Sequence, residues 1–194
     1  SCRALSFAPT DAKFATCSDD KTVRVWDFKT QKEDAKLDGH GWDVKCVCWH
    51  PQKSLLASGS KDRIVKLWNP RTGKCIVSLE SHKHTVNHVE WNRNGKWLLT
   101  ASRDQQCKLF DIRMINEELD AYFHESEVTS LAWHPIHEDM FASGDKFGHL
   151  YVLSFRAFRL FISFHTLIQI LLENRTIENT RRSCEKRTLL TDWW

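Results

Sequence analysis

Glycine and proline are scarce in this chain, and only two of its aromatic residues are tyrosine. The 194 residues include seven glycines and four prolines, too few for a collagen-like or low-complexity chain. The longest apolar run, residues 160–172, is interrupted by polar side chains, whereas a membrane-spanning helix needs about 20 apolar residues. Neither positive nor negative charge predominates, because the net charge is only +3. That balance excludes an acidic tail protein and does not by itself indicate nucleic-acid binding.

Cysteine pairs with the spacing of a metal-binding or redox motif are also missing. The seven cysteines are odd in number, and no two of them form a C-x-x-C pair. Most lie in apolar runs such as residues 44–49, so we expect reduced thiols in the core of a cytosolic or nuclear protein. The first 13 residues contain no apolar segment typical of a signal peptide, and there is no initiating methionine. We therefore expect the sequence to begin inside a longer protein.

What the chain has instead is a repeat with a period of 42 residues. The recurring residues are His40, His82 and His124; Trp49, Trp91 and Trp133; and Asp20, Asp62 and Asp104. Six residues after these three aspartates come Trp26, Trp68 and Phe110, respectively. Short apolar runs bounded by turn-forming residues lie between these markers and predict strands. Four strands per repeat make a small antiparallel sheet, which has to stack on its neighbours to bury both faces.

The dipeptides Gly39-His40 and Trp26-Asp27 mark the opening and the end of this period. With that spacing they resemble the blade of a WD40 β-propeller. The expected fold class is all-β, a partial WD40 propeller over residues 1–155 with about four four-stranded antiparallel blades in an open arc. The repeats are expected at about residues 1–37, 38–79, 80–121 and 122–155. The fourth is degenerate, because Phe147 and Leu153 occupy its Asp and Trp positions.

The residue types of a hydrolase triad, histidine, serine and aspartate, occur together in the second repeat and almost unchanged in the third. An enzyme has no need of the same active site in successive repeats. The resemblance to WD40 blades implies instead a buried structural network that also includes the tryptophan N–H. Its predicted members are His40, Ser58, Asp62 and Trp68, then His82, Thr100 and Asp104, and in the first repeat Asp20 and Trp26. We therefore expect no enzyme and no cofactor. We also expect no metal, since no cysteine or carboxylate is spaced to complete a zinc site around the histidines of residues 82–88.

One rim of the propeller is the expected contact surface. The loop carrying each histidine and the turn carrying each aspartate share this rim, because the His–Asp pairs tie them together. The neighbouring residues Trp42, Lys61, His84, Arg103 and Lys146 are therefore expected to point to it. Cations beside an exposed aromatic ring can bind the phosphates and a base of a nucleic acid, or an acidic protein surface. The alternative is a solvated rim without a partner.

Several stretches are distinctive beyond the generic repeat, namely residues 6–20, 39–47, 97–104, 107–113, 116–119 and 132–138. Over about residues 1–153 the chain resembles the WD-repeat subunit of the pre-mRNA cleavage and polyadenylation specificity factor. The resemblance implies a seven-bladed nuclear scaffold that supports recognition of the AAUAAA polyadenylation signal and docks on other subunits of that complex. The family's best-known RNA-contacting segments precede the first blade present here, so direct contact with pre-mRNA stays open. Neither a membrane nor a small-molecule substrate is expected as a partner.

Two other functions stay open from the sequence. Residues 110–113, Phe-Asp-Ile-Arg, resemble the Trp-Asp-x-Arg box of WD40 substrate receptors of cullin-type ubiquitin ligases. A generic WD40 protein-interaction scaffold is the other alternative.

The repeat stops after residue 155. Residues 156–194 contain no glycine and no proline, and a helix over residues 160–172 would be apolar nearly all round. This non-repeat tail is either a helix that covers the last blade or a gene-model artefact such as a translated intron. The abrupt end of the repeat in mid-blade favours the artefact.

Overall fold

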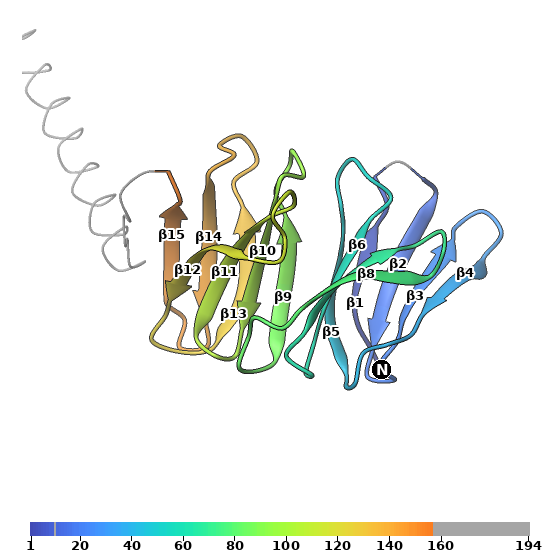
Figure 1. The fold of residues 1–194 in the computed structure, drawn as a ribbon, viewed down its shortest axis with the longest axis horizontal. Coiled ribbons are helices and arrows are strands. Elements are labelled where there is room, and N and C mark those ends of the chain that lie inside the picture. Colours follow the sequence, from blue (N-terminus) through green and yellow to red (C-terminus); the bar gives the residue numbers. More distant parts are fainter. Residues whose placement is uncertain (10, 157–194) are drawn as a thin grey trace, which may run out of the picture.

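The computed structural model describes residues 1–9 and 11–156. The predictions for the C-terminal tail fall on residues 157–194 and lie outside the described part. Within the described residues every regular element is a β-strand (Figure 1). In the same part of the chain, no helix is long and apolar enough to cross a membrane.

The strands form four consecutive antiparallel sheets, which we call blades one to four. Blade one comprises β1 (Cys2–Phe7), β2 (Lys13–Ser18), β3 (Val23–Asp27) and β4 (Lys32–Leu37). Blade two comprises β5 (Val44–Trp49), β6 (Leu56–Ser60), β7 (Val65–Asn69) and β8 (Lys74–Leu79). Blade three comprises β9 (Val86–Trp91), β10 (Trp97–Ser102), β11 (Gln106–Asp111) and β12 (Glu118–Phe123). Blade four comprises β13 (Val128–Trp133), β14 (Met140–Asp145) and β15 (Leu150–Ser154).

Within each blade, every strand pairs with the next one along the chain, as expected when short turns connect antiparallel neighbours. Blade four has three described strands, and a fourth would fall after Ser154, where only Phe155 and Arg156 are described. The expected all-β architecture of stacked small sheets is confirmed.

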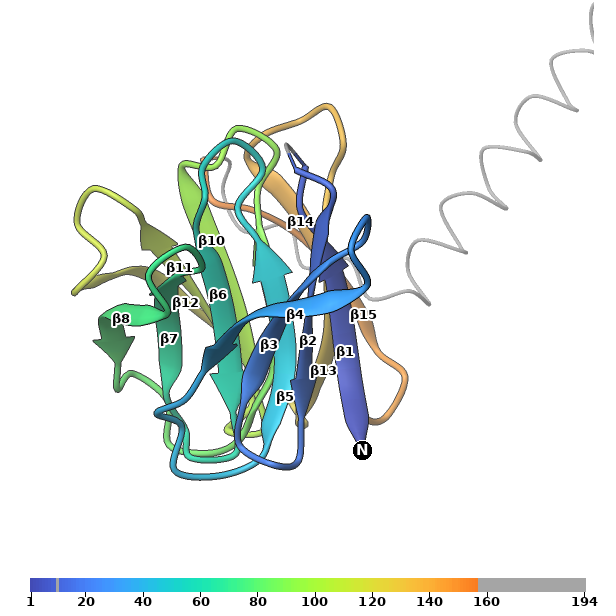
Figure 2. The same cartoon turned by 90° about the vertical axis from the view of Figure 1, so that its right-hand side faces the viewer.

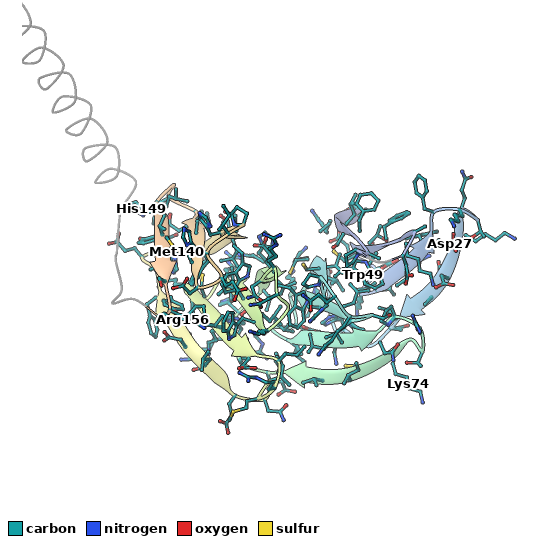
Figure 3. The ribbon with its side chains drawn as sticks, turned by 90° about the horizontal axis from the view of Figure 1, so that it is seen from above. Asp27, Trp49, Lys74, Met140, His149 and Arg156 are labelled. Carbon is teal, nitrogen blue, oxygen red and sulfur yellow. The ribbon has the colours of Figure 1, made fainter. Side chains whose placement is uncertain are left out.

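The blades stack side by side in an open arc that does not close into a ring (Figure 3). The first strands of the blades, β1, β5, β9 and β13, contact one another along the inner side of the arc. The outer strands β4, β8 and β12 form the opposite edges of their sheets, and β8 and β12 lie well to one side of β1 and β5 in Figure 2. Most side chains of β4 and β8 are exposed, and only the last residue of each strand is buried. Within the described residues, the arc is therefore a row of blades in which blades one and four are the two ends.

Apolar side chains fill the seams, which is our term for the surfaces between adjacent blades. Because side chains alternate across a strand, each blade sends one set of residues to the preceding blade and another to the following blade. The seam between blades one and two contains Ala15, Val25, Val47, Trp49, Leu56 and Trp68. The next seam contains Leu67, Val86, Val89, Trp91 and Leu98, and the last contains Leu109, Leu131, Phe141 and Leu153. Burial of each large apolar side chain contributes about 1.5–3 kcal/mol, so the seams hold the arc together.

Candidate functional site

In blade two the structure brings all four predicted network residues together. His40 Nδ1 lies 2.8 Å from Asp62 Oδ2, and His40 Nε2 lies 2.8 Å from Ser58 Oγ. The Trp68 indole N–H donates to the same Ser58 oxygen at 2.8 Å. These contacts link the loop that enters blade two, the second strand, the following turn and the third strand. The network therefore fixes the rim end of the blade.

The ionisation of Asp62 sets the direction of these hydrogen bonds. Burial alone would raise the pKa of Asp62, but hydrogen bonds from His40 and from the Ile64 and Gly41 amides lower this pKa to about 2. A carboxylate only accepts, so Nδ1 of His40 carries a proton and its N–H donates a hydrogen bond to Asp62. In the neutral ring Nε2 then accepts from the Ser58 hydroxyl. Ser58 is fully buried, so its oxygen is not exposed to solvent despite the triad-like order of contacts.

Blade three repeats the arrangement with one donor missing. His82 Nδ1 lies 2.9 Å from Asp104 Oδ2, and His82 Nε2 lies 2.7 Å from Thr100 Oγ1. Hydrogen bonds from His82 also help to lower the pKa of Asp104 to about 2, against a burial effect that raises it. Phe110 fills the tryptophan position and has no N–H to donate. Thr100 Oγ1 instead has the carbonyl oxygen of Lys108 at 3.3 Å.

The first repeat holds only a part of the network. Trp26 Nε1 donates to Thr16 Oγ1 at 2.9 Å, so Thr16 takes the role that Ser58 has in blade two. Sequence reasoning did not single out Thr16, although it stands 42 residues before Ser58. Asp20 accepts from the amide and hydroxyl of Thr22 and pairs with Arg24 at 3.1 Å. The structure therefore does not join Asp20 to Trp26.

In blade four the histidine has kept one partner and lost the other. His124 Nε2 lies 2.7 Å from Ser143 Oγ, as in the complete networks. Its buried Nδ1 atom has no side-chain partner among the described residues. Burial lowers the pKa of His124, and a hydrogen bond with the Tyr122 backbone opposes this effect. Phe147 stands at the aspartate position and is 74% exposed. The nearby Asp145 instead accepts from the Phe147 amide at 3.0 Å and pairs with His149 at 2.9 Å.

A second histidine contact, between blades two and three, escaped the sequence reasoning. His50 is buried, and its Nε2 donates to the carbonyl oxygen of Gly95 at 2.9 Å. Its Nδ1 accepts from the amides of Gln52 and Lys53. A side chain at position 95 would come within 2.3 Å of the His50 ring, so the close approach requires glycine there. The sequence does mark this histidine, because the tripeptide Trp-His-Pro occurs at residues 49–51 and again at 133–135.

Three of the predicted rim residues are anchored to the rim by their backbone. The amides of Lys61, Arg103 and Lys146 each donate at 2.9 Å to the loop that enters their own blade. Lys61 Nζ lies 5.1 Å from the centre of the Trp42 ring, and Trp42 is 54% exposed. His84 is also exposed.

The expectation of three uncommitted rim cations needs revision. The Arg103 guanidinium pairs with Glu127 at 2.8 Å, and Lys146 lies 3.7 Å from the same carboxylate. One carboxylate thus serves two cations, and both cations are already engaged within the chain. Lys61 has no ion pair among the described residues, and neither do Arg63 and Lys83.

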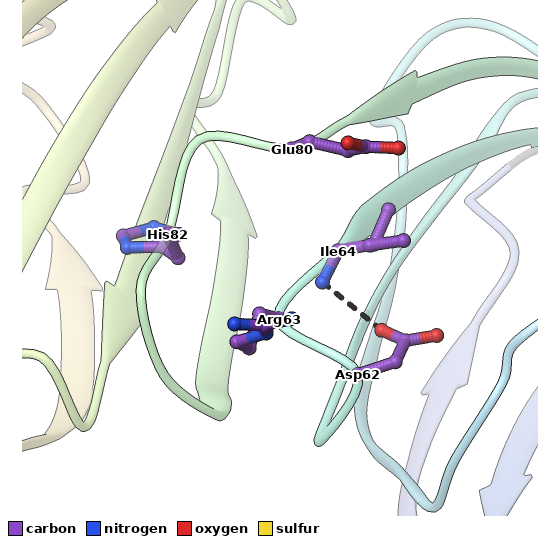
Figure 4. A pocket seen from close by; sticks show the side chains of 5 residues that line it. All are labelled: Asp62, Arg63, Ile64, Glu80 and His82. Carbon is purple, nitrogen blue, oxygen red and sulfur yellow. Dashed lines mark hydrogen bonds between the residues drawn. The ribbon is translucent and has the colours of Figure 1, made fainter.

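A pocket of about 430 Å³ opens on this rim between blades two and three (Figure 4). Its lining residues are Asp62, Arg63, Ile64, Glu80 and His82. At the next seam the His124 amide donates to the Gln105 carbonyl oxygen at 2.8 Å. Among the described residues, no corresponding bond joins the His82 amide to the Arg63 carbonyl oxygen beside the pocket.

The Phe-Asp-Ile-Arg segment has a local structural role. Asp111 accepts from the Arg113 amide at 2.9 Å and from its guanidinium at 2.6 Å. Asp27 and Asn69 accept backbone amides in the same way at the equivalent turns. The acidic residue of the Trp-Asp dipeptide therefore caps the turn that follows it. In the described part of the chain, no group of three or more potential ligands is placed to hold a metal ion.

Comparison with known proteins identifies the repeat and a set of relatives. The family model of the WD40 repeat, described as WD domain, G-beta repeat, matches residues 1–27, 31–69 and 73–111. A protein named polyadenylation factor subunit 2 from Cryptococcus neoformans is 47% identical over 45 residues, 23% of this chain and 6% of that protein. The protein of the same name from Gibberella zeae is 50% identical over 34 residues, 18% of this chain and 6% of that protein.

Coatomer subunit beta'-2 from Arabidopsis thaliana is 46% identical over 37 residues, 19% of this chain and 4% of that protein. The matched stretches thus span about one repeat each and a small fraction of the relatives' own length. Similarity over a single repeat is shared by proteins of different names, whereas the polyadenylation factor name recurs among several fungal relatives.

Proposed function

This chain belongs to the WD domain, G-beta repeat family, and we propose that it is a binding module of the machinery that cleaves and polyadenylates pre-mRNA. The observation that carries the proposal is the 47% identity over 45 residues to polyadenylation factor subunit 2. The module supports assembly of the complex and recognition of the polyadenylation signal, and it works in the nucleus. Its partners are other subunits of the complex, and pre-mRNA is contacted mainly by parts of the protein that precede these blades.

Binding rather than catalysis is also supported by the geometry of the histidine networks. The only His–Ser–Asp set in the described residues with triad-like order has its serine fully buried and hydrogen-bonded to Trp68. We therefore propose that these networks are structural and that the working surface lies on the exposed rim. No catalytic step is assigned to this chain.

Affinity purification of the intact protein that contains this chain tests the proposal. We expect polyadenylation and cleavage subunits to be enriched and a cullin-type ligase adaptor to be absent. A charge-neutral Arg113→Gln variant provides the control for the ligase alternative, since Arg113 is the exposed end of the Phe-Asp-Ile-Arg segment. Recovery of a ligase adaptor that Arg113→Gln abolishes, without polyadenylation subunits, would replace the proposed function by the alternative.

A further inference from the structure

The rim between blades two and three differs from the rest of the described rim in its charge. At the seam between blades one and two, Asp19 pairs with Arg3 at 2.6 Å and with Lys45 at 3.3 Å. At the seam between blades three and four, Glu127 holds the cations described above. Between these two segments of paired charges lie Lys61, Arg63 and Lys83, which form no ion pair among the described residues. We call this segment the central rim.

An exposed tryptophan stands at the edge of the central rim. Trp42 projects from the loop that enters blade two, and Lys61 lies over its ring. The Ser60 hydroxyl holds this loop, with its oxygen 3.0 Å from the Trp42 carbonyl and 2.9 Å from the Asp43 carbonyl. The Lys61 amide donates to Asp43 as well. The backbone is thus ordered before any partner arrives, which lowers the entropy cost of binding.

We propose that the central rim binds an acidic segment of a partner protein, with a carboxylate at Lys61 and an apolar side chain against Trp42. Tryptophan is among the residue types that contribute most to the binding energy of protein interfaces. The pocket between Arg63 and His82 gives a neighbouring side chain of the segment a place to enter (Figure 4). This inference deepens the proposed function, because it names the kind of partner that the module takes.

The charge distribution favours a protein segment over RNA. Glu80 lines the pocket and forms no ion pair among the described residues. Asp62, whose lowered pKa keeps it ionised, lines the same pocket and pairs with no lysine or arginine among the described residues. A phosphate chain carries a charge at every nucleotide and would meet these carboxylates within one blade's width. One or two carboxylates set among neutral residues fit the short positive segment without that repulsion.

Fluorescence anisotropy with three labelled probes tests the proposal on the full chain. The probes are a pool of twelve-residue peptides made of Asp, Glu, Leu and Phe, the matching pool with Asn and Gln for the acids, and a twelve-nucleotide single-stranded RNA. We expect binding of the acidic pool alone. Lys61→Gln should weaken that binding about fivefold or more, and Trp42→Ala should weaken it at least as much.

Matched controls separate the central rim from a general effect of charge. Lys29→Gln removes an exposed lysine at the turn after β3, and Arg103→Gln removes a cation already paired with Glu127; both should change the affinity less than about twofold. Tighter binding of RNA than of the acidic pool, no binding of either, or equal effects of Lys29→Gln and Lys61→Gln would overturn the inference. If the affinity purification recovered no polyadenylation subunits while the acidic peptides still bound the central rim, only the proposed function would be disproved.

Discussion

Two residues, His124 and Phe147, show at the scale of single side chains what the network contributes. His124 keeps its serine partner but its buried Nδ1 lacks a carboxylate partner, because an exposed phenylalanine stands where blades two and three have aspartate. Phe147→Asp would place an acceptor at that position. We expect it to raise the free energy of unfolding by about 1–2 kcal/mol, measured by urea denaturation.

Phe147→Ala is the control for loss of the exposed phenyl ring. It should leave the stability within about 0.5 kcal/mol of the parent, as is usual for exposed positions. If the aspartate variant were no more stable than the alanine variant, the lack of a carboxylate partner would not be a source of instability.

The lowered pKa values of Asp62 and Asp104 make the networks sensitive to acid. Both groups have a pKa of about 2 in the folded chain and 3.8 as the ordinary value. Between these values the unfolded chain binds more protons, so stability falls as the pH drops from about 4 to about 2. We expect a loss on the order of 1–2 kcal/mol per group, measured by urea denaturation at pH 5 and pH 3. The double variant Asp62→Asn with Asp104→Asn should be less stable at pH 5 and lose less on acidification; a parallel loss would contradict the assignment.

At the scale of elements, the turn between β3 and β4 can be compared with its counterpart between β7 and β8. Gln31 has a φ of 55°, and Gly73 occupies the equivalent position with a φ of 70°. Glycine adopts this left-handed conformation without steric cost. Gln31→Gly should therefore stabilise the chain by about 0.5–1 kcal/mol, and Gly73→Gln should destabilise it by a similar amount, in thermal denaturation. Changes of the same sign in the two variants would refute this explanation.

The seam between blades three and four contains a buried acid, Glu90 on β9. Burial raises the pKa of Glu90 to about 7, and its Oε2 atom has no hydrogen-bond partner among the described residues. The folded chain thus holds this proton longer than the unfolded chain, and stability falls as the pH rises from about 4.5 to 7. Glu90→Gln should be more stable than the parent at pH 8 by about 1–3 kcal/mol, with little difference at pH 4.5. An equal difference at both pH values would show that Glu90 is not the titrating group.

The strands were predictable from the sequence because the markers of the repeat recur every 42 residues and turns separate the apolar runs. The missing donor at Phe110 was equally visible, since phenylalanine has no N–H. The ion pairs of Glu127 with Arg103 and Lys146 were not predictable, because they depend on how two loops and a turn of adjacent blades meet. The bond between His50 and Gly95 likewise joins two blades through residues that no single repeat places together.

At the scale of the whole molecule, the arc leaves the outer face of blade one uncovered. Leu5 and Phe7 are 57% and 67% exposed, whereas their counterparts Val47 and Trp49 are buried against the preceding blade. Apolar surface of this kind promotes association. We expect the isolated chain to self-associate in sedimentation velocity and the double variant Leu5→Gln, Phe7→Gln to do so less. Ile136→Gln, at an exposed loop, is the matched control; an equal effect of the control would show that the blade face is not involved.

Under the proposed function, this propeller arc serves the formation of mRNA 3′ ends. Sequencing of transcripts after depletion of the intact protein tests it most directly, by counting reads that run past polyadenylation sites. We predict that read-through rises, that the wild-type protein restores normal ends, and that a Lys61→Gln, Trp42→Ala variant restores them only in part. Unchanged read-through on complete depletion would contradict the account.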